Sequence, residues 1–211
     1  MFKHAKMDKH RFIVQEMRAT PKKSDRRIVR TRHSLSQALV DLIKEKRFDE
    51  ITIQDVIDRA DVGRSTFYSH FRDKEDLFQE GWKAFLKEFA SAIDWQRAGE
   101  GKFVPANYLF THLRDVQPFY KGLVRSRMTD RVFKSGIMNL AEFLEEGLAA
   151  HLKNRPKPSL PVPVLVNYLA TQLFALLKWW LDHDMPYPPE RMDDMFHGLI
   201  NPTFKTSLTP K

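Results

Sequence analysis

The segment that most constrains the fold is 52-TIQDVIDRADVGRSTFYSHF-71, where two short helical patterns flank a turn. Thr52 and Asp55 have the Ser/Thr-x-x-Asp/Glu spacing of a capping box, which predicts a helix over about 53–60. Residues 61–63, which include a glycine, interrupt the pattern, and another helix is expected to run to the end of the segment. Two short helices joined by such a turn form a helix-turn-helix motif.

The second helix of this motif is expected to have one apolar and one polar side. Phe67 and Phe71 lie four residues apart, so they share a face and can pack inward together with Val62. Bulky apolar groups would hold a helix away from base edges in a DNA major groove about 12 Å wide, whereas small polar groups would not. The pattern favours a recognition helix, although any short surface helix also carries polar residues outward. The outward residues are Arg64, as the guanine reader, and Ser65, Thr66, Tyr68, Ser69 and Arg72.

Basic residues are concentrated at the N-terminus. Residues 1–32 carry 11 Lys and Arg against three acidic residues, a net charge that equals the +8 of the whole chain. Residues 1–24 are therefore predicted to form a basic arm. Such an arm is either a solvated tail or a segment that contacts DNA phosphates, for example in the minor groove.

The composition argues against several classes of protein. The chain has 211 residues and no cysteine, which excludes disulfides, thiolate metal sites and a cysteine nucleophile. The eight histidines are not at ligand spacing, so neither a metal site nor a cofactor is expected. Enzyme motifs such as G-x-S-x-G, the P-loop and H-E-x-x-H are missing, which leaves an enzyme using a helical cavity as a weak alternative. Without a secretory signal, a cytoplasmic protein is expected.

Helical periodicity extends over the rest of the chain, so the fold class is predicted to be all-α. Turn-forming residues separate the helical stretches, notably the glycines of segment 98–102 and the prolines of 156–158 and 186–189. Besides the two helices of the motif, helices are expected at about 24–47, from 74 to the 98–102 segment, and at 105–115, 117–127, 129–153, 162–181 and 190–200.

The segment 162-VPVLVNYLATQLFALLKWWL-181 is apolar nearly all the way round. A helix of this kind must be covered on every side. Its polar residues, among them Asn167 and Lys178, and the lack of a basic flank argue against a membrane. We therefore expect a homodimer, formed through the helices at about 162–183 and 189–200.

Several short motifs occur together at family spacing: 48-FDEITIQDV-56, Ala60, Val62, 66-TFY-68, 70-HF-71, 74-KE-75 and Leu77. Through them residues 28–78 resemble the N-terminal domain of TetR-family (tetracycline-repressor-like) transcriptional regulators. The resemblance implies an N-terminal three-helix helix-turn-helix DNA-binding domain and a C-terminal helical domain for effector binding and dimerisation. These domains are expected at 25–74 and 75–211, after the basic arm at 1–24.

The resemblance also implies which residues contact DNA. The start of the recognition helix would reach base edges or nearby phosphates, and its end would hold the DNA backbone. Lys74 would pair with one phosphate, and Thr52 would cap its helix against another. The expected DNA-binding residues are Thr52, Arg64, Ser65, Thr66, Tyr68, Ser69, His70 and Lys74.

Two turn residues depart from the family pattern, which usually has glycine at the position of Asp61 and serine at that of Gly63. Aspartate tolerates a left-handed turn, and glycine is an acceptable N-cap, so the fold should survive both changes. Loss of the serine hydroxyl removes one candidate phosphate contact.

The implied function is a dimeric repressor that binds a palindromic operator in double-stranded DNA and is released by a small apolar or amphipathic effector. The alternative is an architectural or adaptor protein that binds DNA without effector control. Aromatic, sulfur and polar side chains of the C-terminal part are candidates to line an effector cavity, although most would serve equally well in a plain core. These candidates are Phe85, Phe89, Phe110, His112, Phe119, Tyr120, Met138, Tyr168 and Gln172.

Overall fold

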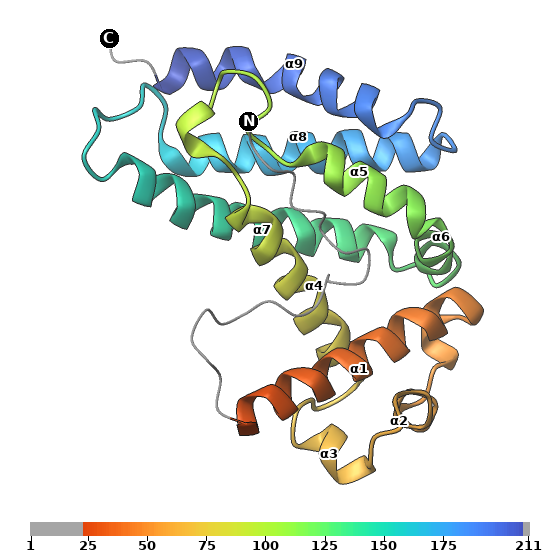
Figure 1. The fold of residues 1–211 in the computed structure, drawn as a ribbon. Coiled ribbons are helices and arrows are strands. Elements are labelled where there is room, and N and C mark those ends of the chain that lie inside the picture. The colour runs from red at the N-terminus through yellow and green to blue at the C-terminus, as the bar shows by residue number, and fades with distance from the viewer. Residues whose placement is uncertain (1–22, 209–211) are drawn as a thin grey trace. The chain divides into compact units, whose positions relative to one another are not determined.

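The computed structural model describes residues 23–208, and within them it contains helices and no strand (Figure 1). The all-α prediction is confirmed. Most of the predicted basic arm lies outside the described residues. The chain forms two compact units that divide within helix α4 (Lys74–Ser91), between Phe85 and Leu86. The sequence placed the boundary earlier, at the start of this helix.

The N-terminal unit consists of α1 (Lys23–Glu45), the 3₁₀ turn η1 (Phe48–Glu50), α2 (Ile53–Ala60), α3 (Arg64–Tyr68) and the first part of α4. Apolar residues at helical spacing on α1 face those of the other helices, and their burial drives the unit together. The side chains of this core with at most 2% exposure are Leu35, Leu39, Ile43, Ile51, Val56, Phe67 and Leu77.

Helix α2 begins and ends where its sequence predicts. The hydroxyl of Thr52 accepts the N–H of Asp55 at 3.1 Å, and the Asp55 carboxylate accepts the N–H of Thr52 at 2.7 Å, which completes the capping box. Asp61 follows in the left-handed region, with φ 52° and ψ 51°. The structure thus confirms that aspartate accommodates the turn at this position.

Helix α3 is shorter than predicted, because it ends at Tyr68 and not near Phe71. After Tyr68 the chain tightens: the N–H of His70 bonds to the carbonyl of Phe67, three residues back. Asp73 then accepts the N–H of Asp76 at 2.7 Å and starts α4. Because Asp73 already caps α4, only four residues lie between it and Tyr68, too few for α3 to continue by another turn and for the chain to change direction.

The C-terminal unit contains the end of α4, the 3₁₀ turn η2 (Trp95–Arg97), α5 (Ala106–Asp115), α6 (Gln117–Arg125), α7 (Thr129–Leu152), α8 (Val162–Asp182) and α9 (Pro189–Leu208). Helices α7 and α8 pack along each other, and α9 packs on α5 and α8 (Figure 1). The apolar stripes between them are closed to water. Their members include Leu140, Leu144 and Leu148 of α7 and Leu165, Leu169 and Leu173 of α8.

Helix α9 is longer than the predicted 190–200, since it continues through Pro202 to Leu208. Proline removes a backbone donor and usually ends a helix, and the predicted helix stops two residues before it. Met192, Phe196, Ile200 and Phe204 nevertheless recur every four residues, and each has 0% exposure. Burial of Phe204 carries the helix past the proline.

Among the described helices, α8 is the one long and apolar enough to cross a membrane by length and composition. The most apolar stretch of 18 residues in α8 has a mean hydropathy of 1.3, and 50% of it is buried inside the protein. This burial is typical of the central helix of a folded domain, and α8 is in fact packed against α7 and α9.

Candidate nucleic-acid interface and ligand pocket

Helix α3 has the two sides that its sequence predicts. Phe67 is fully buried and Phe71 is 3% exposed, so both pack into the N-terminal unit. Arg64, Ser65 and Ser69 are exposed on the other side. Tyr68 is 50% exposed, although its ring meets Phe67 edge-on, whereas Thr66 and His70 are half-buried. The unit therefore presents a short polar helix flanked by one aromatic ring.

Arg64 is held from the neighbouring helix. Its guanidinium donates to the side-chain oxygen of Gln54 at 2.7 Å, and the amide nitrogen of Gln54 donates to Asp58 at 2.6 Å. Gln54 and Asp58 lie four residues apart on the same face of α2, so Asp58 orients the Gln54 amide that binds Arg64 at the start of α3. The sequence did not predict these contacts, because they depend on how the turn brings the two helices together.

Residues at the end of α3 are also engaged. The hydroxyl of Ser69 donates to the carbonyl of Thr66 at 2.7 Å, which leaves its oxygen as an acceptor. Burial, followed by the positive charge of Arg32, lowers the pKa of His70 below its ordinary 6.5. The imidazole is therefore neutral at pH 7, and it can offer DNA a hydrogen bond but no charge.

A basic stretch of α1 lies next to the end of α3. The guanidinium of Arg32 lies 4.8 Å from the ring centroid of Phe71 and makes an ion pair with Glu80. Arg26, Arg27 and Arg30 are exposed on the turns of α1 that precede it. The start of α1 thus adds positive charge beside α3, which suits a polyanion.

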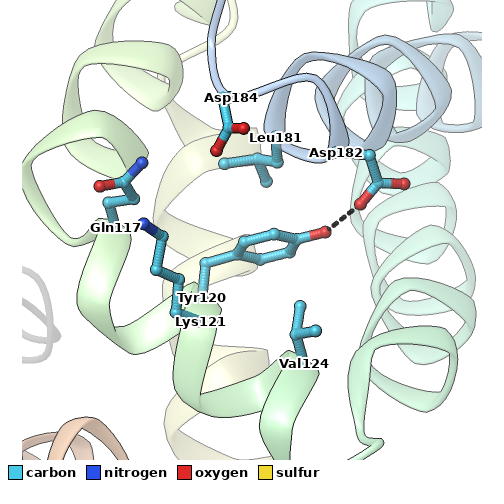
Figure 2. A pocket seen from close by; sticks show the side chains of 7 residues that line it. All are labelled: Gln117, Tyr120, Lys121, Val124, Leu181, Asp182 and Asp184. Atoms are coloured by element: carbon cyan, nitrogen blue, oxygen red, sulfur yellow. Dashed lines mark hydrogen bonds between the residues drawn. The ribbon is translucent and has the colours of Figure 1, made fainter.

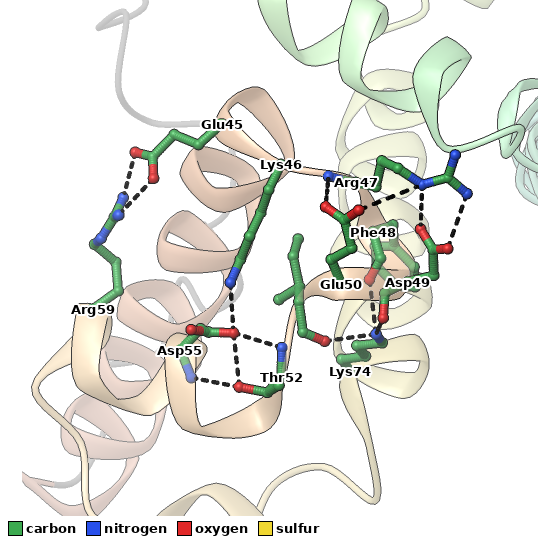
Figure 3. Close-up of polar contacts among 11 residues, drawn as sticks. Glu45, Lys46, Arg47, Phe48, Asp49, Glu50, Thr52, Asp55, Arg59 and Lys74 are labelled. Atoms are coloured by element: carbon green, nitrogen blue, oxygen red, sulfur yellow. Dashed lines mark hydrogen bonds and ion pairs between the residues drawn. The ribbon is translucent and has the colours of Figure 1, made fainter.

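The start of α2 is fixed by a group of polar contacts (Figure 3). Lys46 pairs with Asp55 at 2.7 Å, and the hydroxyl of Thr52 donates to the same carboxylate at 2.7 Å. The hydrogen bond from Lys46, followed by those from Thr52, lowers the pKa of Asp55. Thr52 caps its helix as expected, with both of its donors on Asp55, and its phosphate contact stays a prediction.

The ammonium of Lys74 faces three main-chain carbonyls (Figure 3). They belong to Phe48, Asp49 and Ile51, in the loop that leads to α2. The contact of Lys74 with a phosphate stays a prediction.

The C-terminal unit has a pocket of about 240 Å³ between α6 and the end of α8 (Figure 2). The hydroxyl of Tyr120 donates to the carboxylate of Asp182 at 2.6 Å, and Lys178 pairs with the other carboxylate oxygen. Burial, together with the bond to Asp182, raises the pKa of Tyr120. The pocket therefore combines apolar and charged side chains. It is lined by Gln117, Tyr120, Lys121, Val124, Leu181, Asp182 and Asp184.

Of the residues predicted to bind an effector, Tyr120 lines this pocket. Phe85 belongs to the N-terminal unit, and Met138 is 64% exposed on α7. Phe89 and Phe110 are buried, the latter edge-on to Trp180. The other members are half-buried, and burial lowers the pKa of His112 to about 4. These half-buried members are His112, Phe119, Tyr168 and Gln172.

Helices α8 and α9, which contact each other, both expose apolar side chains. Val164 is 53% and Trp179 41% exposed on α8, and with the exposed Ala175 between them they form a stripe along that helix. On α9, Leu199 is 58% exposed.

Two family models match the chain. Residues 35–80 match the model for bacterial regulatory proteins of the tetR family, and residues 106–202 match a transcriptional regulator C-terminal region. The first match spans the helix-turn-helix and the second spans α5 to α9. The chain belongs to the TetR family of transcriptional regulators. Its helix-turn-helix is the DNA-binding part, and its relatives are regulators rather than enzymes.

Individual relatives agree with this assignment. The uncharacterized HTH-type transcriptional regulator YxbF of Bacillus subtilis (strain 168) is 43% identical over 63 residues. That match covers 29% of this TetR-family chain and only 17% of the relative's length.

Solved structures share the fold at low sequence identity. The dihydroxyacetone kinase operon activator DhaS has a TM-score of 0.63 at 15% identity, over 85% of this chain and 98% of its own. A tetR-family transcriptional regulator of Streptomyces coelicolor has a TM-score of 0.53 at 19% identity, over 79% of both chains. These likenesses concern the arrangement of the helices.

Proposed function

We propose that this TetR-family protein is a dimeric repressor that binds a palindromic operator and releases it when a small molecule enters its C-terminal unit. The carrying observation is the exposed face of α3, with Arg64 held at its start by Gln54. An arginine held in place by a neighbour is suited to bidentate contact with guanine in the major groove. The proposed contacts along α3 and just after it are Arg64, Ser65, Thr66, Tyr68, Ser69 and His70.

The dimer is proposed from the exposed apolar side chains of α8 and α9. Exposed apolar residues on two neighbouring helices, with Trp179 on α8 and Leu199 on α9, are suited to burial against the same helices of a second copy. To bind one operator together, the two copies would need their recognition helices about 34 Å apart, one turn of DNA. This spacing is why the operator is proposed to be palindromic.

Effector control is proposed from the pocket beside Tyr120. Its apolar Leu181 and Val124 and its charged Lys121 and Asp184 suit a small amphipathic molecule that carries a charged group. Among the fold neighbours, DhaS is by name an operon activator. A likeness at 15% identity concerns the fold, so repression here rests on the family resemblance. The proposed setting is the cytoplasm.

The operator proposal is tested by selecting bound duplexes from a random DNA pool with wild-type protein, Arg64→Ala and Tyr68→Ala. We expect a palindrome whose half-site loses definition with Arg64→Ala. Arg155→Ala, which removes an exposed arginine of the C-terminal unit, is the charge-matched control and should recover the same site. Enrichment of no sequence would leave charge-driven binding alone and would favour the architectural alternative.

The effector proposal is tested with the selected operator. A collection of small charged amphiphiles is screened for release of the DNA, and any active compound is tested on Val124→Trp, which fills the pocket. Release should be lost while operator affinity is kept. Ala149→Trp, at an exposed position of α7 outside the pocket, is the control. Equal release by Val124→Trp would place the effector elsewhere.

A further inference from the structure

The ammonium of Lys74 lies among three carbonyl oxygens of the loop before α2 (Figure 3). Its distance is 2.7 Å to the oxygen of Phe48, 3.2 Å to that of Asp49 and 2.6 Å to that of Ile51. The same nitrogen lies 5.0 Å from the ring centroid of Phe48, within range of a cation–π contact. Lys74 itself is half-buried at the first position of α4.

These carbonyls lie where the chain leaves a helical turn. Phe48 and Asp49 belong to η1, and Ile51 follows in an extended conformation, with φ −73° and ψ 124°. Carbonyls at the C-terminal end of a helical turn carry partial negative charge. The carbonyl of Phe48 also accepts the N–H of Ile51 at 3.2 Å, so for it the ammonium is a second donor. A cation placed among these carbonyls offsets their partial charge.

An ammonium has three N–H donors and no acceptor, and here each donor has a carbonyl. A phosphate would have to take Lys74 away from at least one of them. We propose that Lys74 is a positioning residue, which fixes the Phe48–Ile51 loop to the start of α4 and thereby sets the helix-turn-helix for DNA, and that it does not pair with a phosphate.

The contacts between Lys74 and the three carbonyls, here called the clamp, lie close along the chain to the residues proposed to face DNA. Ile51 precedes Thr52, the N-cap of α2, so the clamp fixes the point where α2 begins. Within the first turn of α2, Gln54 holds Arg64 at the start of the recognition helix. The inference rests on the proposed operator binding for its effect on DNA, whereas the clamp itself is a property of the folded N-terminal unit.

Two substitutions of Lys74 distinguish a clamp on the loop from a contact with a DNA phosphate. Lys74→Arg keeps the positive charge, but a planar guanidinium cannot direct three N–H groups at carbonyls around one point. Lys74→Met keeps the length and removes the charge. If Lys74 bound a phosphate, Lys74→Arg would retain operator affinity, and Lys74→Met would lower the slope of log K against log salt by about 0.9.

For a clamp we expect both variants to bind the selected operator about tenfold more weakly or worse, at a temperature where both are folded, with non-specific affinity and the salt slope unchanged. Retained affinity in Lys74→Arg together with a reduced slope in Lys74→Met would overturn the inference. Unchanged operator affinity in both variants, with only a lower melting temperature, would also overturn it.

Amide hydrogen exchange supplies a readout that does not need DNA. The backbone from Phe48 to Asp55 should lose protection in Lys74→Met, whereas Lys83→Met, an exposed lysine of the same helix, should leave it unchanged. If the wild type selects no operator but the exchange result holds, the proposed function fails and the clamp stands. If protection is unchanged in Lys74→Met, the clamp is refuted whatever the DNA result.

Discussion

The imidazole of His197 lies one turn after the carboxylate of Asp193 on α9, with 3.2 Å between Nδ1 and Oδ1. Both side chains are buried, at 4% and 3% exposure. The other ring nitrogen, Nε2, accepts the N–H of Val104 at 3.3 Å, which assigns the proton of the neutral ring to Nδ1. Asp193 also accepts the N–H of Asn107 at 3.0 Å and pairs with Lys102 at 2.7 Å. Together these contacts fasten the segment before α5 to α9.

Replacing this carboxylate should destabilise the protein in a pH-dependent way. Burial raises the pKa of Asp193, while bonds to His197 and Lys102 lower it, and the net direction is downward. A depressed pKa means that the stabilisation is present above the unfolded-state value of about 3.9 and is lost as the pH falls through the folded value. We expect Asp193→Asn to reduce the free energy of unfolding by about 1–3 kcal/mol near neutral pH. Urea unfolding should show this difference shrinking below about pH 4.

Asp194 provides the matched control for that experiment. It also lies 2.7 Å from the Lys102 ammonium, but its side chain is 51% exposed. An exposed pair contributes little, so Asp194→Asn should unfold like the wild type. If both variants lost equal stability, the burial of Asp193 would not be the reason.

Gln54 and Arg64 should act together in DNA recognition. With Gln54→Ala, the arginine loses its 2.7 Å partner and becomes less ordered, so base preference at its position should relax. In a double-mutant cycle of operator affinities we expect a coupling of about 0.5–1.5 kcal/mol. Gln37→Ala, which removes another exposed glutamine bonded to an aspartate one turn away, should have no effect. Additive costs for Gln54→Ala and Arg64→Ala would show that the contact is unimportant for recognition.

Local signals in the sequence predicted the start of the helix-turn-helix well. The capping box of Thr52 and Asp55 and the turn at Asp61 act through neighbouring residues, so the bounds of α2 follow from them. The predicted ends of α3 and α9 were wrong. The cap that Asp73 forms for α4 limits α3, whereas burial of Phe204 in the core extends α9 past Pro202. The four-residue spacing of Phe204 after Ile200 indicates a shared face, but the sequence does not show that this face stays covered beyond the proline.

In the candidate site too, features that depend on neighbouring residues could be predicted, and features that depend on distant residues could not. The inward side of α3 follows from the four-residue spacing of Phe67 and Phe71. The contacts of the Lys74 ammonium did not follow, because its carbonyl partner Phe48 lies 26 residues earlier and meets it only in the folded unit. The pocket was likewise missed apart from Tyr120, since its walls come from α6 and α8 and include charged residues that resemble ordinary surface positions.

Gly63 should accept serine with a gain in stability. Its φ of −66° and ψ of 147° suit any residue, and an added Cβ would meet nothing closer than the Thr66 hydroxyl at 3.9 Å. Serine as N-cap of α3 should raise the free energy of unfolding by a few tenths of a kcal/mol, roughly the difference between serine and glycine caps. Gly63→Ala adds the same Cβ without the hydroxyl and should lower stability in thermal unfolding. A gain with alanine as large as with serine would show that chain entropy, not capping, is responsible.

Charge placed on the exposed apolar side chains of α8 and α9 should break the proposed dimer. Trp179 is 41% and Leu199 58% exposed, so glutamate at either position keeps the core intact but would put a charge into an apolar interface. We expect Trp179→Glu and Leu199→Glu to sediment as monomers and to lose operator affinity by more than about tenfold, because each half-site alone binds weakly. Met138→Glu, on α7 at 64% exposure and outside the stripe, should remain dimeric. If all three variants remained dimers, the dimer interface would not include these residues of α8 and α9.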